Sequence, residues 1–211
     1  MNANINKLYM YIDNIPILAR TIKAFHDCCV IDEIILVVNQ DDIIYCKHNI
    51  ADYYNFKKVR KIVAGGKTRQ ESVFKGLSET DSKCGIVLIH DGARPFIRER
   101  AIMESIDAAN DIGASCVAVP VKDTVKSSDS KSFVQETLDR ENLWSVQTPQ
   151  TFKFDLIMSA HKRALEDGFE GTDDAVLVER LGFPLKLVMG SYDNIKITTQ
   201  EDLAIAEAII R

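Results

Sequence analysis

The sequence predicts an α/β protein whose doubly wound, mostly parallel sheet carries a protruding β-arm. Short apolar runs such as "EIILVV" and "IVLI" have the composition of fully buried strands. Between them lie segments in which apolar residues recur at helical spacing, and this alternation is typical of parallel sheets. The 211 residues fit one domain spanning 1–211. Because ligands of such sheets bind beyond the carboxyl ends of strands, the residues that follow each strand are the first candidates for a site.

Helices and strands alternate from the start of the chain to about residue 112. The expected elements, in order, are a helix at about 16–28, a strand at 31–39, a helix from about 41, a strand at 61–64, a helix at 68–77, a strand at 85–89 and a helix at about 98–112. Asp13 or Asn14 can cap the first helix, with Pro16 in its first turn. Thr68 can cap the third helix, because Glu71 follows it three residues later, as in a capping box.

The alternation is interrupted after an expected strand at 114–121. Residues 121–150 show no helical period, and "DTVKSSDSKSFVQETL" has the pattern of two short strands around a polar turn. We interpret 121–150 as a β-arm, since an excursion of this length is usually functional or packs on a partner. The expected elements after it are helices at about 154–167 and 173–181, a strand at 184–190, the segment 194–199 and a helix at 200–210. Thr172 and Thr199 are the expected caps of the last two helices.

Composition and charge limit the classes of function. The net charge of -5 argues against broad nucleic-acid binding, although it leaves room for a small basic pocket that binds a phosphorylated ligand. The apolar stretches are far shorter than the roughly 20 residues that a membrane span needs, and no signal-peptide pattern is visible. The five cysteines lack the spacing of a metal site, which indicates reduced thiols rather than bound zinc. We therefore expect a cytoplasmic protein without a membrane partner.

The first candidate site follows the strand in "KIVAGGKTRQES". Gly65 and Gly66 lie between that strand and a capped helix, where a ligand can approach the backbone closely. The N-terminus of the helix offers free N–H groups and the positive end of its dipole, and Ser72 lies in the first turns. The alternative interpretation is an ordinary turn between a strand and a helix, because a pair of glycines alone is a weak signal.

The second candidate site follows the strand in "GIVLIHDGARP". Asp91 comes directly after the apolar run, and Arg94 follows three residues later. A carboxylate at this place can hold Mg²⁺, which usually needs only one or two carboxylates together with substrate phosphates, or it can hydrogen-bond a ribose. The alternative is an Asp91–Arg94 salt bridge that shapes the turn. We interpret His90 as a structural residue.

Two basic residues are candidates for binding phosphate. Lys196 lies in the otherwise apolar segment "NIKITT" and can act as a point charge on a phosphate group. Arg140, in "LDRENLW", can be a second clamp that the arm presents. The alternatives are a solvent-facing lysine and a solvated surface arginine.

Six segments, taken together and in order, resemble the 2-C-methyl-D-erythritol 4-phosphate cytidylyltransferases over roughly residues 5–210. The segments are "GGKTRQESV", "HDGARPF", "VPVKDTVK", "DRENLWSVQTPQTF", "GTDDA" and "DNIKIT". The resemblance implies a Rossmann-like nucleotidyltransferase domain that dimerises through the arm and uses Mg²⁺. It implies transfer of a cytidylyl group from CTP to 2-C-methyl-D-erythritol 4-phosphate, with release of pyrophosphate. Ribitol-5-phosphate cytidylyltransferases are similar in the sheet motifs and "QTPQ", but "DRENLW" is more typical of the methylerythritol enzymes.

The resemblance also implies roles for individual residues. Lys7 matches the lysine that stabilises charge on the α-phosphate, although Leu8 follows it where the family usually has Gln. The residues matching the cytidine-binding segment are Gly65, Gly66 and Ser72, and Lys67 stands where relatives often carry an acid. Asp91 matches the Mg²⁺ and ribose residue, with Arg94 beside it.

The remaining matches concern the sugar-alcohol phosphate. Arg140 and Lys196 match the two residues that grip the methylerythritol phosphate, and Arg140 would serve the site of the neighbouring subunit. The residues matching further substrate contacts are Thr148, Thr172 and Asp193. The β-arm at 121–150 would thus both form the dimer and complete the partner's site.

The segment "MNANINKLYM" raises a further expectation. The family begins with a strand and a glycine-rich loop of the type A-A-G-x-G-x-R-M, and Met1 aligns with the Met of that loop. We expect the first strand and the loop to be encoded upstream of residue 1. Without them, neighbouring strands would be unpaired beside an unfilled groove, and the 211 residues as given would bind CTP weakly and have low activity. The alternative is a non-catalytic dimeric homologue.

Overall fold

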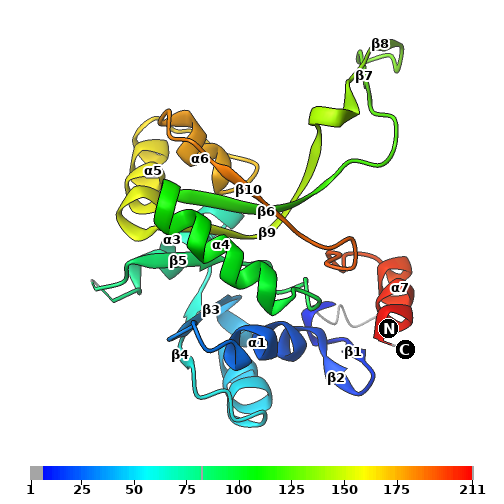
Figure 1. The fold of residues 1–211 in the computed structure, drawn as a ribbon. Helices are drawn as coiled ribbons and strands as arrows, with labels where there is room; N and C mark the ends of the chain where they lie inside the picture. The colour runs from blue at the N-terminus through cyan, green and yellow to red at the C-terminus, as the bar shows by residue number, and fades with distance from the viewer. Residues whose placement is uncertain (1–6, 82, 211) are drawn as a thin grey trace.

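A computed structural model of the protein describes residues 7–81 and 83–210 (Figure 1). Two sheets form its centre, one of four strands in the order β10-β6-β9-β5 and one of two strands, β3 and β4. The strands are β3 (Ile34–Val38), β4 (Val59–Ala64), β5 (Ile86–Ile89), β6 (Ala114–Pro120), β9 (Trp144–Lys153) and β10 (Lys186–Met189). β3 is parallel to β4 and β6 is parallel to β10. The predicted α/β class is confirmed.

β9 is a long strand of the central sheet that sequence reasoning missed. It is antiparallel to both β5 and β6, so the four-stranded sheet is mixed. Its first seven residues lie within 121–150, the range assigned to the arm, and this boundary was therefore wrong. The buried stretch of β9 includes "QTPQT", whose polar side chains conceal a strand that is buried in the sheet. Pro149 has no N–H to give to the ladder, and the pairing with β6 shifts between Cys116 and Ala118 at this place.

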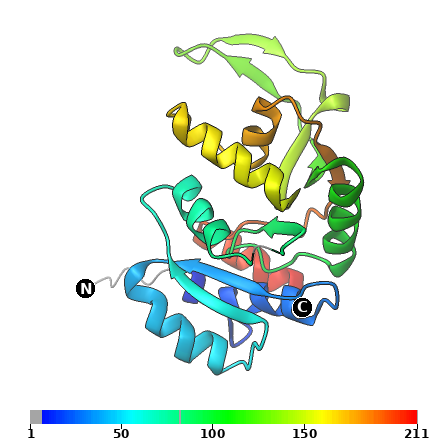
Figure 2. The same ribbon diagram turned by 90° about the vertical axis from the view of Figure 1, so that its left-hand side faces the viewer.

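Helices cover both faces of the four-stranded sheet (Figures 1 and 2). The helices are α1 (Ile17–Asp27), α2 (Ile43–Tyr45), α3 (Arg69–Ser78), α4 (Glu99–Ile112), α5 (Phe154–Glu166), α6 (Ala175–Arg180) and α7 (Gln200–Ile210). Ile102 of α4 packs in one core cluster with Val117 of β6, and α5 and α6 pack in another with Ala114 of the same strand. Because successive side chains of a strand point to opposite faces, these two clusters lie on opposite sides of the sheet.

Two of the predicted helix caps are confirmed. Thr68 accepts the backbone N–H of Glu71 at 3.2 Å and begins α3. Thr199 accepts the backbone N–H of Asp202 at 3.2 Å and begins α7. In both turns a hydroxyl satisfies one of the N–H groups that the first turn of a helix leaves unpaired.

The other two predicted caps were wrong. Asp13 and Asn14 have positive φ and form the turn between the short strands β1 (Tyr11–Ile12) and β2 (Ile15–Pro16), a conformation that Asp and Asn tolerate better than most residues. Thr172 is exposed, and the Asp173 carboxylate instead accepts the N–H of Val176 in the first turn of α6. α1 therefore begins after Pro16 without a side-chain cap, whereas Asp173 takes the role expected of Thr172 in α6.

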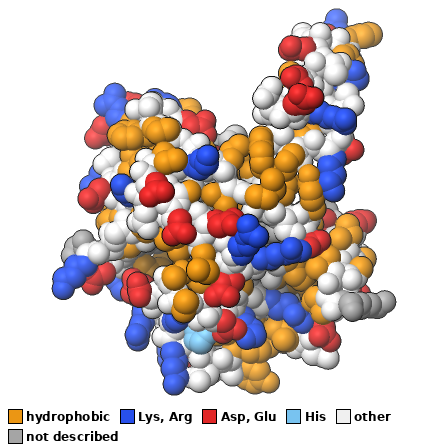
Figure 3. Space-filling view, viewed as in Figure 1, with side chains coloured by type: hydrophobic (Ala, Val, Ile, Leu, Met, Phe, Trp, Pro, Cys, Tyr) orange, Lys and Arg blue, Asp and Glu red, His pale blue; other side chains and the backbone are white. Residues whose placement is uncertain are grey.

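The arm projects from the body of the molecule (Figures 1 and 3). Its tip is an antiparallel ribbon of β7 (Lys126–Ser128) and β8 (Val134–Thr137). The side chains of β8 are all exposed, and Phe133 beside them is 69% exposed. Charged side chains of both signs lie along the ribbon in Figure 3. The arm thus contributes little to the core of its own chain.

The two sheets are separated by a groove. Within the described residues β3 pairs with β4 and β5 pairs with β9, while the facing edges of β3 and β5 pair with no strand. The groove has a volume of about 820 Å³, and apolar side chains of both strands, α1 and α3 line it. The expected strand and loop upstream of Met1, and residues 1–6 of "MNANINKLYM", lie outside the described residues, so that expectation stays a prediction. No helix in the described part of the chain is long and apolar enough to cross a membrane.

Candidate active site

Three cationic side chains surround the carboxylate of Asp91, which lies just beyond β5. Lys196 Nζ is 3.1 Å from Asp91 Oδ2, and Arg94 Nε is 3.4 Å from the same oxygen. Arg69 Nε is 3.6 Å from Asp91 Oδ1. The structure therefore brings together Asp91, Arg94 and Lys196, which the sequence predicted from separate strand ends. It adds Arg69, which sequence reasoning missed.

The cluster carries more positive than negative charge. Burial would raise the pKa of the Asp91 carboxyl, but Lys196, Arg69 and Arg94 outweigh it and lower that pKa overall. Asp91 is therefore ionised at neutral pH, and three cations face its carboxylate, one of which, Arg69, also pairs with Asp174. A small site with this imbalance attracts the phosphate groups of a ligand although the whole chain is acidic.

A chain of hydrogen bonds fixes the backbone of the Asp91 loop. The backbone N–H of Asp91 donates to Thr148 Oγ1 at 3.1 Å, and this hydroxyl is 3.0 Å from His90 Nδ1. His90 Nε2 is 3.0 Å from the carbonyl oxygen of Arg94, which can only accept, so Nε2 carries the proton and Nδ1 accepts from Thr148. Burial lowers the pKa of His90 to about 4, which agrees with a neutral ring. His90 and Thr148 thus shape the loop, as the structural interpretation of His90 predicted.

Asn194 docks the loop that carries Lys196 against this site. Its side chain is buried, and Nδ2 donates at 3.1 Å to Gln147 Oε1 and at 3.1 Å to the carbonyl oxygen of Thr148. Its own carbonyl accepts from Arg94 Nη1 at 2.8 Å. The segment 194–199 does not form a strand. The hydrogen bonds of Asn194 nevertheless hold its start in place and so position Lys196.

Gly65, Gly66 and Ser72 line a cavity of about 160 Å³ between the turn after β4 and the end of β3. Ser72 Oγ accepts the N–H of Gly66 at 2.9 Å and donates to the carbonyl of Thr68 at 2.9 Å. A Cβ on Gly65 would lie 2.8 Å from Ser72 Oγ, so this position needs glycine. Lys67 contributes its backbone N–H to Glu71 Oε2 at 2.7 Å. These hydrogen bonds hold the turn at the edge of the cavity.

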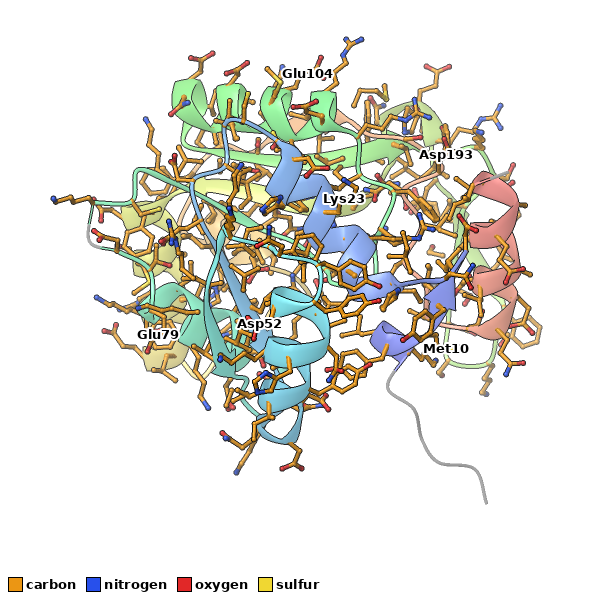
Figure 4. All side chains as sticks on the ribbon, turned by 90° about the horizontal axis from the view of Figure 1, so that it is seen from below. Met10, Lys23, Asp52, Glu79, Glu104 and Asp193 are labelled. Carbon is orange, nitrogen blue, oxygen red and sulfur yellow. The ribbon has the colours of Figure 1, made fainter. Side chains whose placement is uncertain are left out.

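Lys7 and Asp193 lie on the flank of the site, around the same C-terminal loop. Lys7, in η1 (Lys7–Tyr9), is exposed and its Nζ donates to the carbonyl of Thr198. The carboxylate of Asp193 is 2.6 Å from Arg98 Nη2 and accepts from Ser191 Oγ at 3.1 Å. Figure 4 labels Asp193 on the side of the molecule where α7 lies. Both residues lie near the loop that carries Lys196. The structure records no direct contact between either of them and Asp91.

Two predicted residues lie apart from this cluster. Arg140, in η4 (Arg140–Asn142), is exposed at the base of the arm and donates from Nη1 to the carbonyl of Lys122 at 3.0 Å. Thr172 is exposed in the turn before α6. Within one chain, therefore, the structure does not bring Arg140 or Thr172 to Asp91.

Arg69 had a signal in the sequence that could have been used. A basic side chain in the first turn of a helix faces the positive end of the dipole, which is unfavourable unless an acid binds it. The acids are Asp91 and Asp174, and Arg69 Nη1 is 2.7 Å from Asp174 Oδ2. The described residues contain no group of three or more His, Cys, Asp or Glu side chains arranged to hold a metal ion.

Comparisons with known proteins identify the family of this chain. The family model for 2-C-methyl-D-erythritol 4-phosphate cytidylyltransferase (IspD) matches residues 1–211. The chain belongs to this family. An IspD relative from Caldanaerobacter subterraneus subsp. tengcongensis is 51% identical over 211 residues, which are 100% of this chain and 93% of the relative. One from Clostridium novyi is 52% identical over 211 residues and is covered to 90%. Both carry the family's name.

Solved IspD structures share the fold. The crystal structure of 4-diphosphocytidyl-2C-methyl-D-erythritol synthase from Anaerococcus prevotii has a TM-score of 0.88 and 36% identity, covering 95% of this chain and 88% of that one. The enzyme from Thermus thermophilus has a TM-score of 0.82 and 32% identity, covering 97% and 94%. The family and the Rossmann-like nucleotidyltransferase fold predicted from the sequence are thus confirmed.

Proposed function

We propose that the protein transfers the cytidylyl group of CTP to 2-C-methyl-D-erythritol 4-phosphate. The products are 4-diphosphocytidyl-2-C-methyl-D-erythritol and pyrophosphate. The curated IspD relatives, about half identical over the whole chain, bear the name of this activity. The observation that carries the proposal is the ionised Asp91 among Arg69, Arg94 and Lys196 at the carboxyl end of β5.

This chemistry needs positioned cations more than a base. An oxygen of the methylerythritol phosphate attacks the α-phosphorus of CTP, and the bond from that phosphorus to the pyrophosphate oxygen breaks. The nucleophile is already an anion, so no proton has to leave it. The enzyme must align the methylerythritol phosphate with the α-phosphate of CTP. It must also stabilise the negative charge of the transition state. Lys196 and Arg94 are held in place for this, and Lys7 would act from the flank.

The nucleotide would occupy the cavity beside the Gly65–Gly66 turn. Ser72 lines both this cavity and the groove that reaches Asp91, so the two places are adjacent. Glycines let the pyrimidine approach the backbone, whose amide and carbonyl groups can distinguish one base from another. The ribose and phosphates would then extend toward Asp91 and its cations. Thr148, Thr172 and Asp193 would contact the acceptor substrate.

Mg²⁺ fits Asp91 as its protein ligand. The carboxylate is ionised, its side chain is 15% exposed at the rim of the groove, and it offers the hard oxygen that Mg²⁺ prefers. A single protein carboxylate suffices where substrate phosphates and water complete the coordination. When bound, the ion would neutralise charge on the phosphate oxygens. Asp91 itself would hold the ion while Lys196 and Arg94 face the phosphates.

The arm would complete the site of a second subunit. Arg140 is exposed in η4, at the base of an arm that projects from the body of the molecule, and Phe133 and Val134 at the tip are exposed apolar side chains. In a twofold dimer each arm would lie on the partner and supply Arg140 as the second phosphate clamp. We also place the enzyme in the cytoplasm, where its five free cysteines stay reduced, and expect neither nucleic acid nor a membrane as partner.

The test is an assay of the purified protein, expressed with any residues that its gene encodes before Met1. CTP and methylerythritol 4-phosphate with Mg²⁺ should release pyrophosphate, and mass spectrometry should detect the diphosphocytidyl product. Ribitol 5-phosphate is the competing acceptor, and a clear preference for it would replace the proposed substrate. Nucleotide binding without any turnover would identify a non-catalytic homologue and refute the proposal.

A further inference from the structure

Arg69 links the candidate active site to a carboxylate inside the protein. Its Nε faces Asp91 Oδ1 at 3.6 Å, and its Nη1 lies 2.7 Å from Asp174 Oδ2. Asp91 is in the loop after β5, whereas Asp174 immediately precedes α6. Attraction to Asp174 and then to Asp91 raises the pKa of Arg69 against the lowering effect of burial. One guanidinium thus joins two parts of the fold that are distant in sequence.

Asp174 is a buried charge without a capping function. Its side chain is 1% exposed, and Asp173, not Asp174, accepts the helix N–H of Val176. Gln150 Oε1 accepts the backbone N–H groups of Asp174 and Ala175, so the main chain at this point is satisfied by another residue. The carboxylate of Asp174 therefore remains available for the two basic groups beside it.

The second basic group is His161 of α5, which is also buried. Its Nε2 is 3.3 Å from Asp174 Oδ1 but forms no hydrogen bond with it, so Arg69 pairs with one carboxylate oxygen and His161 only borders the other. A buried carboxylate is unfavourable unless it is paired, and removing one partner leaves it exposed to the apolar surroundings. The arrangement gives Arg69 a buried counter-charge.

The geometry requires the fork of an arginine. Nε and Nη1 donate in different directions from a planar group, so Arg69 can face two carboxylates at once. A lysine has a single ammonium at the end of a flexible stem and cannot hold both in fixed geometry. Arg69 faces Oδ1 of Asp91, whereas Lys196 and Arg94 face Oδ2. With a cation beside each oxygen, the orientation of the carboxylate plane is fixed.

We propose that Arg69 is a positioning residue that, paired with the buried carboxylate of Asp174, fixes the orientation of the Asp91 carboxylate. The proposal rests on the proposed function only in assuming that Asp91 acts in the site. Arg69 would not touch the reacting phosphates. Its effect would be on how well Asp91 presents an oxygen to a divalent cation, and therefore on turnover more than on nucleotide affinity.

The first experiment uses Arg69→Lys in the protein expressed with any residues encoded before Met1. We expect kcat to fall roughly 10- to 100-fold, the usual range for a small misplacement in a site, while KM for CTP changes less than about threefold. The Mg²⁺ concentration at half-maximal rate should rise. Binding of Mn²⁺ in the presence of CTP, followed by electron paramagnetic resonance, should weaken in parallel. Unchanged kcat together with unchanged Mn²⁺ binding would overturn the proposal.

A second pair of variants separates positioning from folding. Arg69→Met leaves Asp174 buried with one partner lost and should lower the thermal unfolding midpoint. Adding Asp174→Asn removes the stranded charge and should restore most of that midpoint. If Arg69 is a positioning residue, the double variant regains stability but not kcat or Mn²⁺ affinity. Recovery of all three would show a merely structural role and would overturn the proposal.

Two controls complete the design. Arg180→Lys alters an arginine of matched exposure, 37% against 36% for Arg69, whose ion pair with Asp167 at 2.8 Å lies away from the site, and it should leave kcat unchanged. Asp91→Asn tests the assumption beneath the proposal. If Asp91→Asn retains full activity, the proposed site fails. If it is inactive while Arg69→Lys behaves as the unaltered protein, only the positioning role of Arg69 fails.

Discussion

The hydroxyl of Thr148 lies 3.0 Å from Nδ1 of His90, and both side chains are committed to the loop that ends at Arg94. Thr148 belongs to β9, which is antiparallel to β5, so the contact spans two strands of the sheet. The same hydroxyl accepts the backbone N–H of Asp91. Thr148, on the neighbouring strand β9, therefore sets the position of the Asp91 carboxylate.

The first prediction concerns Thr148→Val. The two side chains have similar shapes, but valine leaves the N–H of Asp91 and Nδ1 of His90 without their partner. We expect the free energy of unfolding to fall by about 1–3 kcal/mol for these unpaired groups, and kcat to fall as the Asp91 loop loosens. Urea unfolding and steady-state rates measure the two effects. Thr148→Ser keeps the hydroxyl, and a serine variant as weak as the valine variant would contradict this explanation.

The second prediction concerns Lys196→Gln. The Lys196 side chain is 44% exposed, so losing its ion pair with Asp91 should change stability by less than about 1 kcal/mol. Removing one positioned cation from a phosphate-transfer site should nevertheless lower kcat by roughly 100-fold or more. Lys186→Gln, at the exposed start of β10, is the control and should leave the rate unchanged. Equal rates for the two variants would remove Lys196 from the mechanism.

The third prediction concerns Gly66→Ala. An added Cβ would overlap the Cβ of Glu71 and lie 3.2 Å from its carbonyl carbon, so the turn after β4 must shift. We expect KM for CTP to rise at least tenfold and stability to fall by about 1–3 kcal/mol. Isothermal titration with CTP checks the affinity. Gly85→Ala meets nothing within 4 Å and should bind CTP normally.

The fourth prediction is a pH dependence at Asp202. Its carboxylate accepts the N–H groups of Thr198 and Thr199 and the hydroxyl of Thr198, and these bonds lower the pKa of Asp202 to about 2. Because the pKa is lower when folded than when unfolded, the ionised group stabilises the fold above about pH 4, and this contribution is lost as the pH falls through about 2. Thermal unfolding of the unaltered protein and of Asp202→Asn should therefore differ at pH 6 and converge near pH 2. A constant difference would argue against the linkage.

The fifth prediction tests whether Arg140 acts in the partner's site. Arg140→Met and Lys196→Met should each be inactive alone. If arms are exchanged, a mixed dimer has one site with both residues intact and one with neither. Co-refolded in equal amounts, the two variants should regain about a quarter of normal activity, since half of the dimers are mixed and half of their sites are complete. No recovery in dimers that sedimentation confirms as mixed would assign Arg140 to its own subunit.

Local patterns predicted much of this molecule. Asp91 and Lys196 were found because each follows a strand, and parallel strands meet at one edge. β9 was missed because "QTPQT" is polar, and its burial depends on partners such as Asp173, whose carboxylate accepts from Gln150 at 2.7 Å. Arg69 was missed because the signal of a basic residue in the first turn of α3 was not used, and its partner Asp174 is distant in sequence. Pairings between distant polar residues have no periodic signal, so they appear only when the fold is known.

The C-terminal helix α7 packs in one core cluster with β1, which lies near the N-terminal end of the described residues. Ile12 of β1 lies in one core cluster with Ile197 and with Ala206 of α7, and all three are almost completely buried. During synthesis the N-terminal hairpin therefore leaves the ribosome long before the residues that cover it exist. Ile12 stays exposed to solvent and to chaperones until α7 has left the ribosome. Burial of Ile12 thus depends on residues far along the chain, and a nascent chain that stalls before α7 would display an unfinished, aggregation-prone surface.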